Sequence, residues 1–220
     1  MAGVAQAGSE EGCAVKDRLL EDFFKENGHE LSGLQLEKMA TFLHNIEIFG
    51  TSLGLIEARG QQLIVDHLLD SMAPVRILEE ISLASLCDVG SGAGFPGIVL
   101  AIALPNLPIV LAERMQKRSR FLAMMQQKLQ LDNVEVYHGD IKHIDRHFDG
   151  MTFRALEQMT CDLAKLLLSK SDRLFAYKGR AVSVQAEVAQ LARCGYRCEV
   201  EPLAIVGQEK ERHLLMIRKT

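Results

Sequence analysis

The stretch LCDVGSGAGFPGIVLAI, residues 86–102, has the residue types and spacing of a nucleotide-binding loop. It places four glycines within eight positions between two apolar runs, a density that lets backbone approach a ligand closely. Two spacings overlap in it. G-x-G-x-G from Gly90, preceded by Asp88, is typical of a loop that holds the amino-acid end of S-adenosylmethionine, whereas G-x-G-x-x-G from Gly92 is the dinucleotide spacing. The two ligands imply methyl transfer and hydride transfer respectively.

The other residues of this loop favour S-adenosylmethionine. Asp88 would bring a carboxylate near the ligand, where it would repel a pyrophosphate and stabilise a cationic amino group or sulfonium. Pro96 removes an N–H at the point where a dinucleotide loop needs helix-terminal donors for phosphate. A nicotinamide-dependent oxidoreductase stays as an alternative on the glycine spacing alone.

An acidic residue lies where a second strand is expected to end. Glu113 follows Gly92 by 21 residues and closes the apolar run PIVLAE. This spacing is typical of the carboxylate that accepts hydrogen bonds from ribose hydroxyls. Both candidate cofactors carry an adenosine ribose, so Glu113 indicates a nucleoside site without separating them.

The elements that must position these residues form a βα alternation after about residue 81. Such alternation predicts a parallel sheet with helices on both faces. The chain closes with two strand candidates joined by the charged turn QEKER, with no helix between them, which predicts an antiparallel hairpin. Expected strands lie within residues 83–90, 108–114, 134–140, 148–156, 173–179, 196–207 and 213–219, and expected helices start near residue 96 and occupy residues 117–131, 161–170 and 184–195. We therefore expect an α/β fold with a mostly parallel seven-stranded sheet, the class I fold of S-adenosylmethionine-dependent methyltransferases.

The chain before this region is predicted to be helical. Residues 1–13 are small and polar without periodicity and are expected to be a flexible leader. Residues 14–80 show apolar positions at three- and four-residue spacing, and their third helical stretch, residues 61–72, ends before Pro74. The expected organisation is this N-terminal helical extension and a methyltransferase domain over residues 81–220, packed as a single compact unit.

Composition narrows the class of partner and the compartment. The net charge of −4 and a pI near 6.0 are unlike a free-standing nucleic-acid binder, so any polyanion contact must use a local patch. Five cysteines, with no C-x-x-C and no paired metal spacing, favour neither a disulfide framework nor a metal site and fit the reducing cytoplasm. Prolines interrupt the longest apolar run, so we expect neither a membrane span nor export.

The loop, together with KRSRFL, FRAL, YKG and the terminal ERHLLMIRK, resembles the RNA methyltransferase G family, also called glucose-inhibited division protein B. The resemblance extends from about Gly33 to the end of the chain, and the Phe95-Pro96-Gly97 step is its most specific part. It implies a bacterial enzyme that transfers methyl from S-adenosylmethionine to nitrogen-7 of one guanine in 16S ribosomal RNA, free or in the small ribosomal subunit. We expect this enzyme to be a cytoplasmic monomer.

The resemblance also implies where the cofactor binds. Together with the loop residues considered above, the predicted cofactor-binding residues are Asp88, Gly90, Ser91, Gly92, Gly94, Phe95, Glu113, Ile141, Lys142 and Arg154. Two positions depart from the family pattern: Asp66 stands where a basic residue is usual, and SLGL replaces an asparagine-leucine-threonine run. Both lie in the helical extension, so they bear on its role more than on the cofactor.

The reacting atom can be narrowed by what the sequence lacks. The expected fourth strand ends in DGMTFRAL, without the Asn/Asp-Pro-Pro-aromatic run of amino-group methylation, and Cys161 is a poorly placed nucleophile for cytosine carbon. Guanine nitrogen-7 needs no general base, because its lone pair carries no proton. Candidate RNA-binding residues are Lys117, Arg118, Arg120, Lys178 and Arg212. A small-molecule methyltransferase and a protein that binds the cofactor without catalysis remain alternatives.

Overall fold

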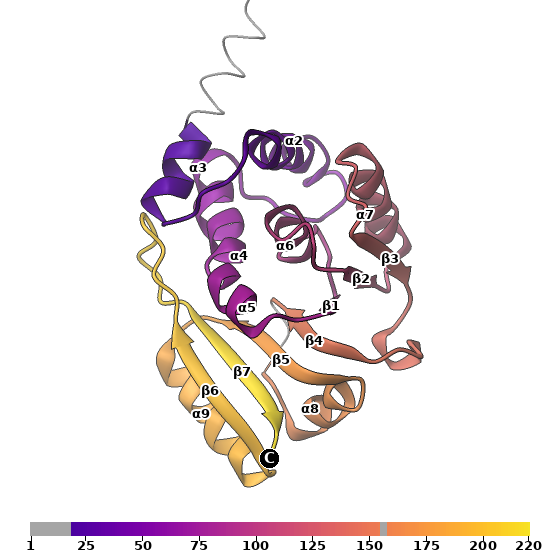
Figure 1. The fold of residues 1–220 in the computed structure, drawn as a ribbon, viewed down its shortest axis with the longest axis vertical. Coiled ribbons are helices and arrows are strands. Elements are labelled where there is room, and N and C mark those ends of the chain that lie inside the picture. Colours follow the sequence, from indigo (N-terminus) through magenta and orange to yellow (C-terminus); the bar gives the residue numbers. More distant parts are fainter. Residues whose placement is uncertain (1–18, 155–157) are drawn as a thin grey trace, which may run out of the picture.

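The computed structural model describes residues 19–154 and 158–220, so the expected leader at residues 1–13 lies outside the described residues. Seven strands form one sheet in the order β3-β2-β1-β4-β5-β7-β6, with helices on both sides of it (Figure 1). The strands are β1 Leu86–Val89, β2 Ile109–Glu113, β3 Val134–His138, β4 Phe148–Phe153, β5 Ser171–Lys178, β6 Tyr196–Pro202 and β7 His213–Lys219. Every predicted strand is present.

The first five strands are parallel, and the last two form the predicted antiparallel hairpin. β7 pairs with β5 on one side and with β6 on the other, so the last strand in sequence lies inside the sheet and β6 forms its edge. Parallel strands buried on both faces read as continuous apolar runs, and β1 and β2 are buried at every position. The predicted fold class is confirmed.

Helices cover the two faces unequally. One face packs against the N-terminal helices, α6 and α7, and the other packs against α8 and α9. Figure 1 shows α7 and β3 at one end of the sheet and the β6–β7 hairpin at the other. The helices are residues 19–26, α2 Gly33–Phe49, α3 Gly60–Leu63, α4 Asp70–Met72, α5 Val75–Ile81, α6 Gly97–Ala103, α7 Gln116–Lys128, α8 Cys161–Leu168 and α9 Ala181–Arg193, with a π-helical segment at Ile64–Leu69 and a 3-10 turn at Ile141–His143.

The helical extension shares a hydrophobic core with the sheet. Phe42 of α2 is fully buried in the same cluster as Leu111 of β2 and Phe175 of β5. A capping box between Ser32 and Gln35 starts α2, and the amide of Gln35 donates to the carbonyl oxygen of Ile102, 2.9 Å away, at the end of α6. The side chain of Gln35 therefore takes part in capping α2 and also links α2 to α6.

The predicted helix over residues 61–72 is continuous but changes geometry. It runs as α3, then as the π-helical segment Ile64–Leu69, then as α4. π-helical turns are rare and recur at functional sites. Here the segment lies against the loop that follows β1, through contacts described in the next subsection.

Candidate active site

The loop after β1 folds as its glycines require. Gly90, Gly92 and Gly94 all have positive φ, at 72°, 53° and 94°, a conformation that L side chains rarely adopt. The N–H groups of Gly90 and Ser91 donate to the carbonyl oxygen of Ala112 at 2.8 and 3.2 Å, which fixes the loop to the end of β2. A Cβ on Gly90 would meet nothing within 4 Å. Backbone at Gly90 is therefore open to a ligand, at the carboxyl ends of the parallel strands where open α/β sheets bind ligands.

Asp88 lies beneath this loop and not at its surface. The residue is 1% exposed, and its Oδ2 accepts a hydrogen bond of 3.0 Å from the N–H of Gly97, the first residue of α6. Its Oδ1 is the one buried side-chain oxygen of the described residues that has no hydrogen-bond partner. Burial raises the pKa of Asp88 to about 7, against the lowering effect of the nearby Ser91 hydroxyl and of the hydrogen bond from Gly97. An unpartnered buried carboxylate favours a cation nearby.

Glu113 links the loop after β1 to the loop after β2. This residue is 4% exposed; its Oε2 accepts from the N–H of Gly92 at 3.0 Å, and its Oε1 accepts from the N–H of Met115 at 2.8 Å. A carboxylate has about four lone-pair sites, so both oxygens can still accept from ribose hydroxyls. The same contact occupies the amide of Gly92, and Asp88 occupies that of Gly97, so neither amide is free for a pyrophosphate.

The residues after β3 lie next to Glu113. The N–H of Gly139 donates to the carbonyl oxygen of Glu113 at 3.1 Å, and the carboxylate of Asp140 accepts from the N–H of Lys142 at 2.9 Å. Ile141 is half-buried and Lys142 is exposed. The predicted residues from the ends of three neighbouring strands thus occupy one edge of the sheet.

Phe95 joins this edge to the helical extension. Its ring is 5% exposed, and the rings of Phe42 and His67 lie 5.0 and 5.5 Å from it, centroid to centroid. The guanidinium carbon of Arg154, which follows β4, lies 5.4 Å from the same centroid. Two residues of the extension therefore support a loop residue and leave it little freedom to move.

Arg154 enters a polar cluster that sequence analysis missed. Its Nη1 lies 3.2 Å from Oδ2 of Asp70, and its Nη2 lies 2.6 Å from Nδ1 of His67. Arginine only donates, so Nδ1 of His67 is the acceptor and the imidazole is neutral. Burial and the nearby Arg154 charge lower the pKa of His67 to about 4, in agreement. The available signal was two acids and a histidine, Asp66, Asp70 and His67, among the apolar residues of the helix at residues 61–72.

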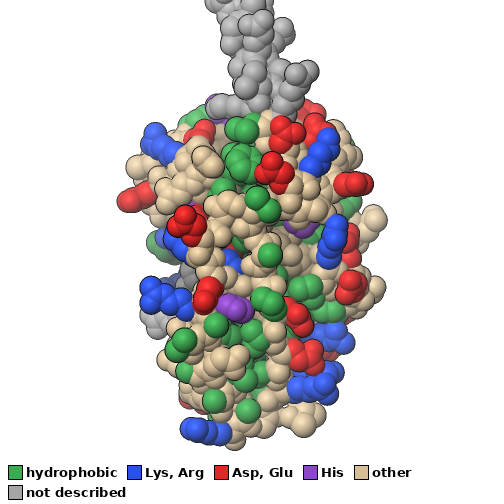
Figure 2. Space-filling model, turned by 90° about the vertical axis from the view of Figure 1, so that its left-hand side faces the viewer, with side chains coloured by type: hydrophobic (Ala, Val, Ile, Leu, Met, Phe, Trp, Pro, Cys, Tyr) green, Lys and Arg blue, Asp and Glu red, His purple; other side chains and the backbone are tan. Residues whose placement is uncertain are grey.

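The candidate RNA-binding residues do not form one patch. Lys117 and Arg120 are exposed on α7, and Arg118 is half-exposed. Lys178 is 10% exposed and pairs with Glu187 at 2.7 Å, whereas Arg212 is 18% exposed and joins the cluster around Asp70. Figure 2 shows positive and negative side chains interspersed over the face that it presents, with apolar ones between them. RNA contact stays a prediction for these residues, and α7 presents the exposed part of the set.

One sequence expectation about the cysteines is wrong. Cys161 and Cys194 form a disulfide, with 6.2 Å between their Cα atoms. They are 33 residues apart, and the pairing arises because the start of α8 and the end of α9 meet on one sheet face, which spacing could not reveal. Cys161 is therefore not a free nucleophile for cytosine methylation.

No group of three or more His, Cys, Asp or Glu residues within 19–154 and 158–220 could hold a metal ion, and no helix there is long and apolar enough to cross a membrane.

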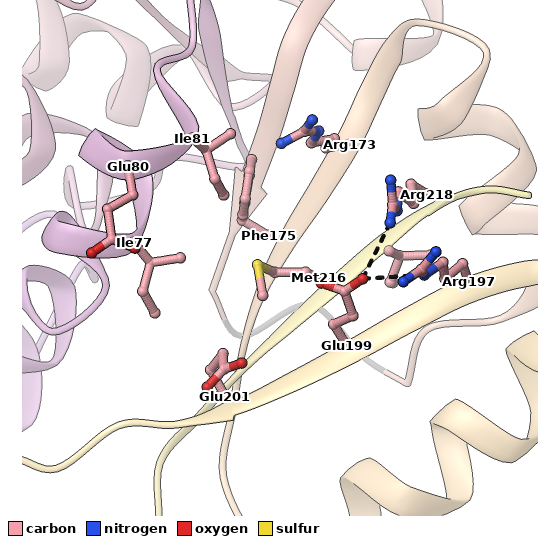
Figure 3. A pocket seen from close by; sticks show the side chains of 11 residues that line it. Ile77, Glu80, Ile81, Arg173, Phe175, Arg197, Glu199, Glu201, Met216 and Arg218 are labelled. Carbon is pink, nitrogen blue, oxygen red and sulfur yellow. Dashed lines mark hydrogen bonds and ion pairs between the residues drawn. The ribbon is translucent and has the colours of Figure 1, made fainter.

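A pocket of about 520 Å³ lies away from these residues, between α5 and the β5-β7-β6 side of the sheet. In Figure 3, Arg197 and Arg218 both contact Glu199 across its floor, at 3.2 and 3.3 Å. No residue predicted to bind the cofactor lines this pocket, so it is separate from the loop site.

The fold and the loop define the class of protein. A sheet of this order, with an open glycine loop after β1 and a carboxylate ending β2, is the class I fold of S-adenosylmethionine-dependent methyltransferases. Solved structures with this fold include a putative O-methyltransferase from Klebsiella pneumoniae, at TM-score 0.56 and 12% identity, covering 81% of this chain and 90% of that one. A putative RNA methyltransferase from Pyrococcus horikoshii matches at TM-score 0.52 and 11% identity, over 79% of this chain and 98% of that one.

Sequence comparison identifies the family within this class. Residues 35–215 match the family model described as rRNA small subunit methyltransferase G, and the chain belongs to this family. A relative named ribosomal RNA small subunit methyltransferase G from Borrelia turicatae is 30% identical over 208 residues, covering 91% of this chain and all of the relative (100%). One of the same name from Treponema denticola is 30% identical over 250 residues, covering 92% and 98%. The resemblance stated from the loop and the terminal hairpin is confirmed.

Proposed function

We propose that this protein transfers the methyl group of S-adenosylmethionine to nitrogen-7 of a guanine in 16S ribosomal RNA. The observation that carries the proposal is membership of the rRNA small subunit methyltransferase G family over residues 35–215. The site agrees with a cationic cofactor, because its buried carboxylates occupy the loop amides that a dinucleotide would need.

Several residues at the strand ends fit the cofactor. S-adenosylmethionine supplies an electrophilic methyl group on a positively charged sulfur. The open backbone at Gly90 would receive its amino-acid end, Glu113 would accept from the ribose hydroxyls, and Ile141 with Lys142 would border the adenine. Asp88 would stabilise the positive charge from beneath the loop, since its Oδ1 has no other partner among the described residues.

The protein's chemical task is orientation. Nitrogen-7 of guanine already carries a free lone pair, so no side chain has to remove a proton, and catalysis depends on holding nitrogen and methyl carbon in line. The base must also leave its stack to reach the methyl group. Arg154, which follows β4 and lies above Phe95, is predicted to contact the cofactor and would also face the incoming base.

For the RNA itself, we propose contact through exposed cations on α7. Lys117 and Arg120 lie one turn apart at the start of that helix, next to the end of β2. Two such contacts on a chain of net charge −4 supply little general affinity for RNA. We therefore propose that the shape of the small subunit contributes to recognition, and that the enzyme acts as a monomer in the cytoplasm.

We also propose that residues 14–80 and 81–220 work as one unit, with no independent N-terminal domain. The shared core supports this, because Phe42 and Phe175 belong to the same buried cluster. Phe42 and His67 of the helical extension also pack against Phe95, so the extension holds the loop after β1 in place.

Methyl transfer to isolated small subunits and to naked 16S RNA tests the proposed reaction. Labelled S-adenosylmethionine should yield 7-methylguanosine on digestion, with more product on particles than on a short naked fragment. Glu113→Gln should weaken cofactor binding about 10- to 100-fold, because a hydrogen bond to a charged group contributes about 1.5–3 kcal/mol. Its matched control is Glu135→Gln on the neighbouring strand, which removes only an exposed pair with Arg146. Absence of 7-methylguanosine on every RNA form would contradict the proposal, and methylation of a small molecule without RNA would indicate the alternative activity.

A further inference from the structure

Asp70 is the meeting point of three segments that are distant in the sequence. Its side chain is 5% exposed, and its two oxygens take one guanidinium each: Arg212 Nε at 2.9 Å on Oδ1 and Arg154 Nη1 at 3.2 Å on Oδ2. Arg154 follows β4, and Arg212 directly precedes β7. A single carboxylate from the helical extension therefore holds two cations at the carboxyl-end edge of the sheet.

The helix that carries Asp70 is fixed on both sides. Next to it, the carbonyl oxygen of Ser71 accepts a hydrogen bond of 3.0 Å from the buried hydroxyl of Tyr177 on β5. The carbonyl oxygen of Asp66, in the π-helical segment, accepts from Nη1 of Arg154 at 3.2 Å. The bond from Tyr177 fixes the helix next to Asp70 without using either arginine, and the Asp66 carbonyl adds a second contact to Arg154.

The charges in this cluster do not cancel. Asp70 contributes one negative charge and the two arginines contribute two positive charges, while His67 is neutral because its Nδ1 accepts from Arg154. Asp66 and Lys210 form a separate pair at 3.1 Å. One net positive charge therefore remains beside Phe95 of the cofactor loop. Among the described residues, Arg212 uses only Nε and Nη1 in hydrogen bonds, to Asp70 and to the carbonyl oxygen of Glu211, so its Nη2 can meet an incoming acceptor.

We propose that Asp70 is a positioning residue, which holds Arg154 and Arg212 side by side so that the two guanidiniums orient the target nucleotide of the RNA against the cofactor loop. The proposal rests on the proposed function. In this arrangement Asp70 does not touch the RNA or the cofactor. It limits the two long side chains to one geometry and prevents their mutual repulsion from separating them.

The variant Asp70→Asn distinguishes two roles of the arginines, orienting the nucleotide and attracting the RNA, because it should weaken the first and strengthen the second. Removing one negative charge raises the local charge from one to two positive charges, which strengthens attraction of a polyanion. Loss of the ion pairs leaves Arg154 with only its contacts to the Asp66 carbonyl and His67, and Arg212 with only the Glu211 carbonyl. The two guanidiniums are then no longer tied to each other, and a misplacement of about 1 Å costs about 100-fold in rate. We expect kcat per folded protein to fall about 100-fold while the KM for small-subunit RNA stays within threefold or falls.

Two further variants keep the test decisive. Asp70→Glu retains the charge but shifts the carboxylate by one methylene, and it should lower kcat about tenfold with unchanged KM. This variant replaces Asp70→Asn if the latter does not fold. Asp149→Asn is the matched control, because Asp149 accepts from the N–H of Ala84 at 2.8 Å at the opposite end of β4. It should lower the melting temperature and leave kcat and KM per folded protein unchanged, with the folded fraction measured by circular dichroism.

The outcomes fall into two groups. A kcat within threefold of wild type for the folded Asp70 variants, or a raised KM with unchanged kcat, would overturn the positioning role. Wild-type protein that forms no 7-methylguanosine would overturn the proposed function, and this result is obtained before any variant is compared.

Discussion

Replacing Asp88 by Asn should change how the free energy of unfolding depends on pH, and the raised pKa of Asp88 gives the size of the change. Asp88 is buried with a pKa of about 7, raised from its ordinary 3.8 by desolvation. Because the folded state holds this proton more tightly than the unfolded state, folding is favoured at low pH, and the free energy of unfolding falls as pH rises from about 4 to about 7. Three pKa units at 1.36 kcal/mol each make the total loss about 4 kcal/mol.

Asparagine removes this titration and keeps the acceptor for the N–H of Gly97. Its amide N–H₂ takes the place of Oδ1, which has no partner among the described residues, and an unsatisfied buried donor costs about 1–3 kcal/mol. Asp88→Asn should therefore be somewhat less stable than wild type at pH 4 and about 1–3 kcal/mol more stable at pH 8. Urea unfolding at four pH values measures the difference. A gap between variant and wild type that changes by less than about 1 kcal/mol from pH 5 to 8 would refute the buried, titrating carboxylate.

The same substitution should affect the cofactor in the opposite direction. A cationic ligand favours the ionised form of Asp88, so affinity of the wild type for S-adenosylmethionine should rise with pH up to about 7, with proton release on binding. Asp88→Asn should bind more weakly, and its affinity should not vary over this range. Calorimetry in two buffers of different ionisation enthalpy measures the released proton, and equal proton release by both proteins would contradict the assignment.

Three further results are expected. A Cβ at Gly97 would overlap the side chains beneath α6, so Gly97→Ala should lower the free energy of unfolding by about 1–3 kcal/mol, whereas Gly33→Ala, with nothing within 4 Å, should change it by less than about 0.5 kcal/mol; similar losses in thermal unfolding would contradict this. His67, with its pKa lowered to about 4 by burial and Arg154, should show no imidazole titration by NMR between pH 5.5 and 8, and a midpoint near its ordinary 6.5 would be inconsistent with the cluster. Lys117→Ala should reduce the slope of log affinity against log salt by about 0.7–0.9 without affecting unfolding, and an unchanged slope would exclude an RNA phosphate contact.

Local pattern was enough to predict the elements but not their order in the sheet. Periodicity placed the helix at residues 117–131 and the structure has α7 at Gln116–Lys128, because apolar spacing alone decides such a segment. It did not show that β7 enters the sheet between β5 and β6. The charges of β6, at Arg197, Glu199 and Glu201, suit an edge strand. The pairing of β7 with β5 joins residues distant in the sequence, so no local pattern shows it.

Some residues of the candidate site could also be predicted from local sequence, and others could not. The glycine loop could be predicted because positive φ restricts the residue type, and Glu113 because its spacing from the loop is local to one βα unit. The Asp70 cluster could not be predicted, because its bonds join residues 84 and 142 positions apart. The disulfide of Cys161 was missed for a related reason, since helix packing and not sequence spacing brings its partner within reach.

The hydrogen-bond acceptors of the loop amides distinguish between the two ligands that the overlapping glycine spacings predict. In a dinucleotide site the loop amides and the helix N-terminus are free to bind phosphate oxygens. In this protein the amides of Gly92 and Gly97 donate to Glu113 and Asp88 at 3.0 Å each. The carboxylates satisfy these donors, so a pyrophosphate would lose its hydrogen bonds and would meet the carboxylates of Glu113 and Asp88 at this end of the loop. A sulfonium and an amino group need no such donors and are attracted by the same charge. Composition of the loop allows both ligands, and the charge beneath it selects the cation.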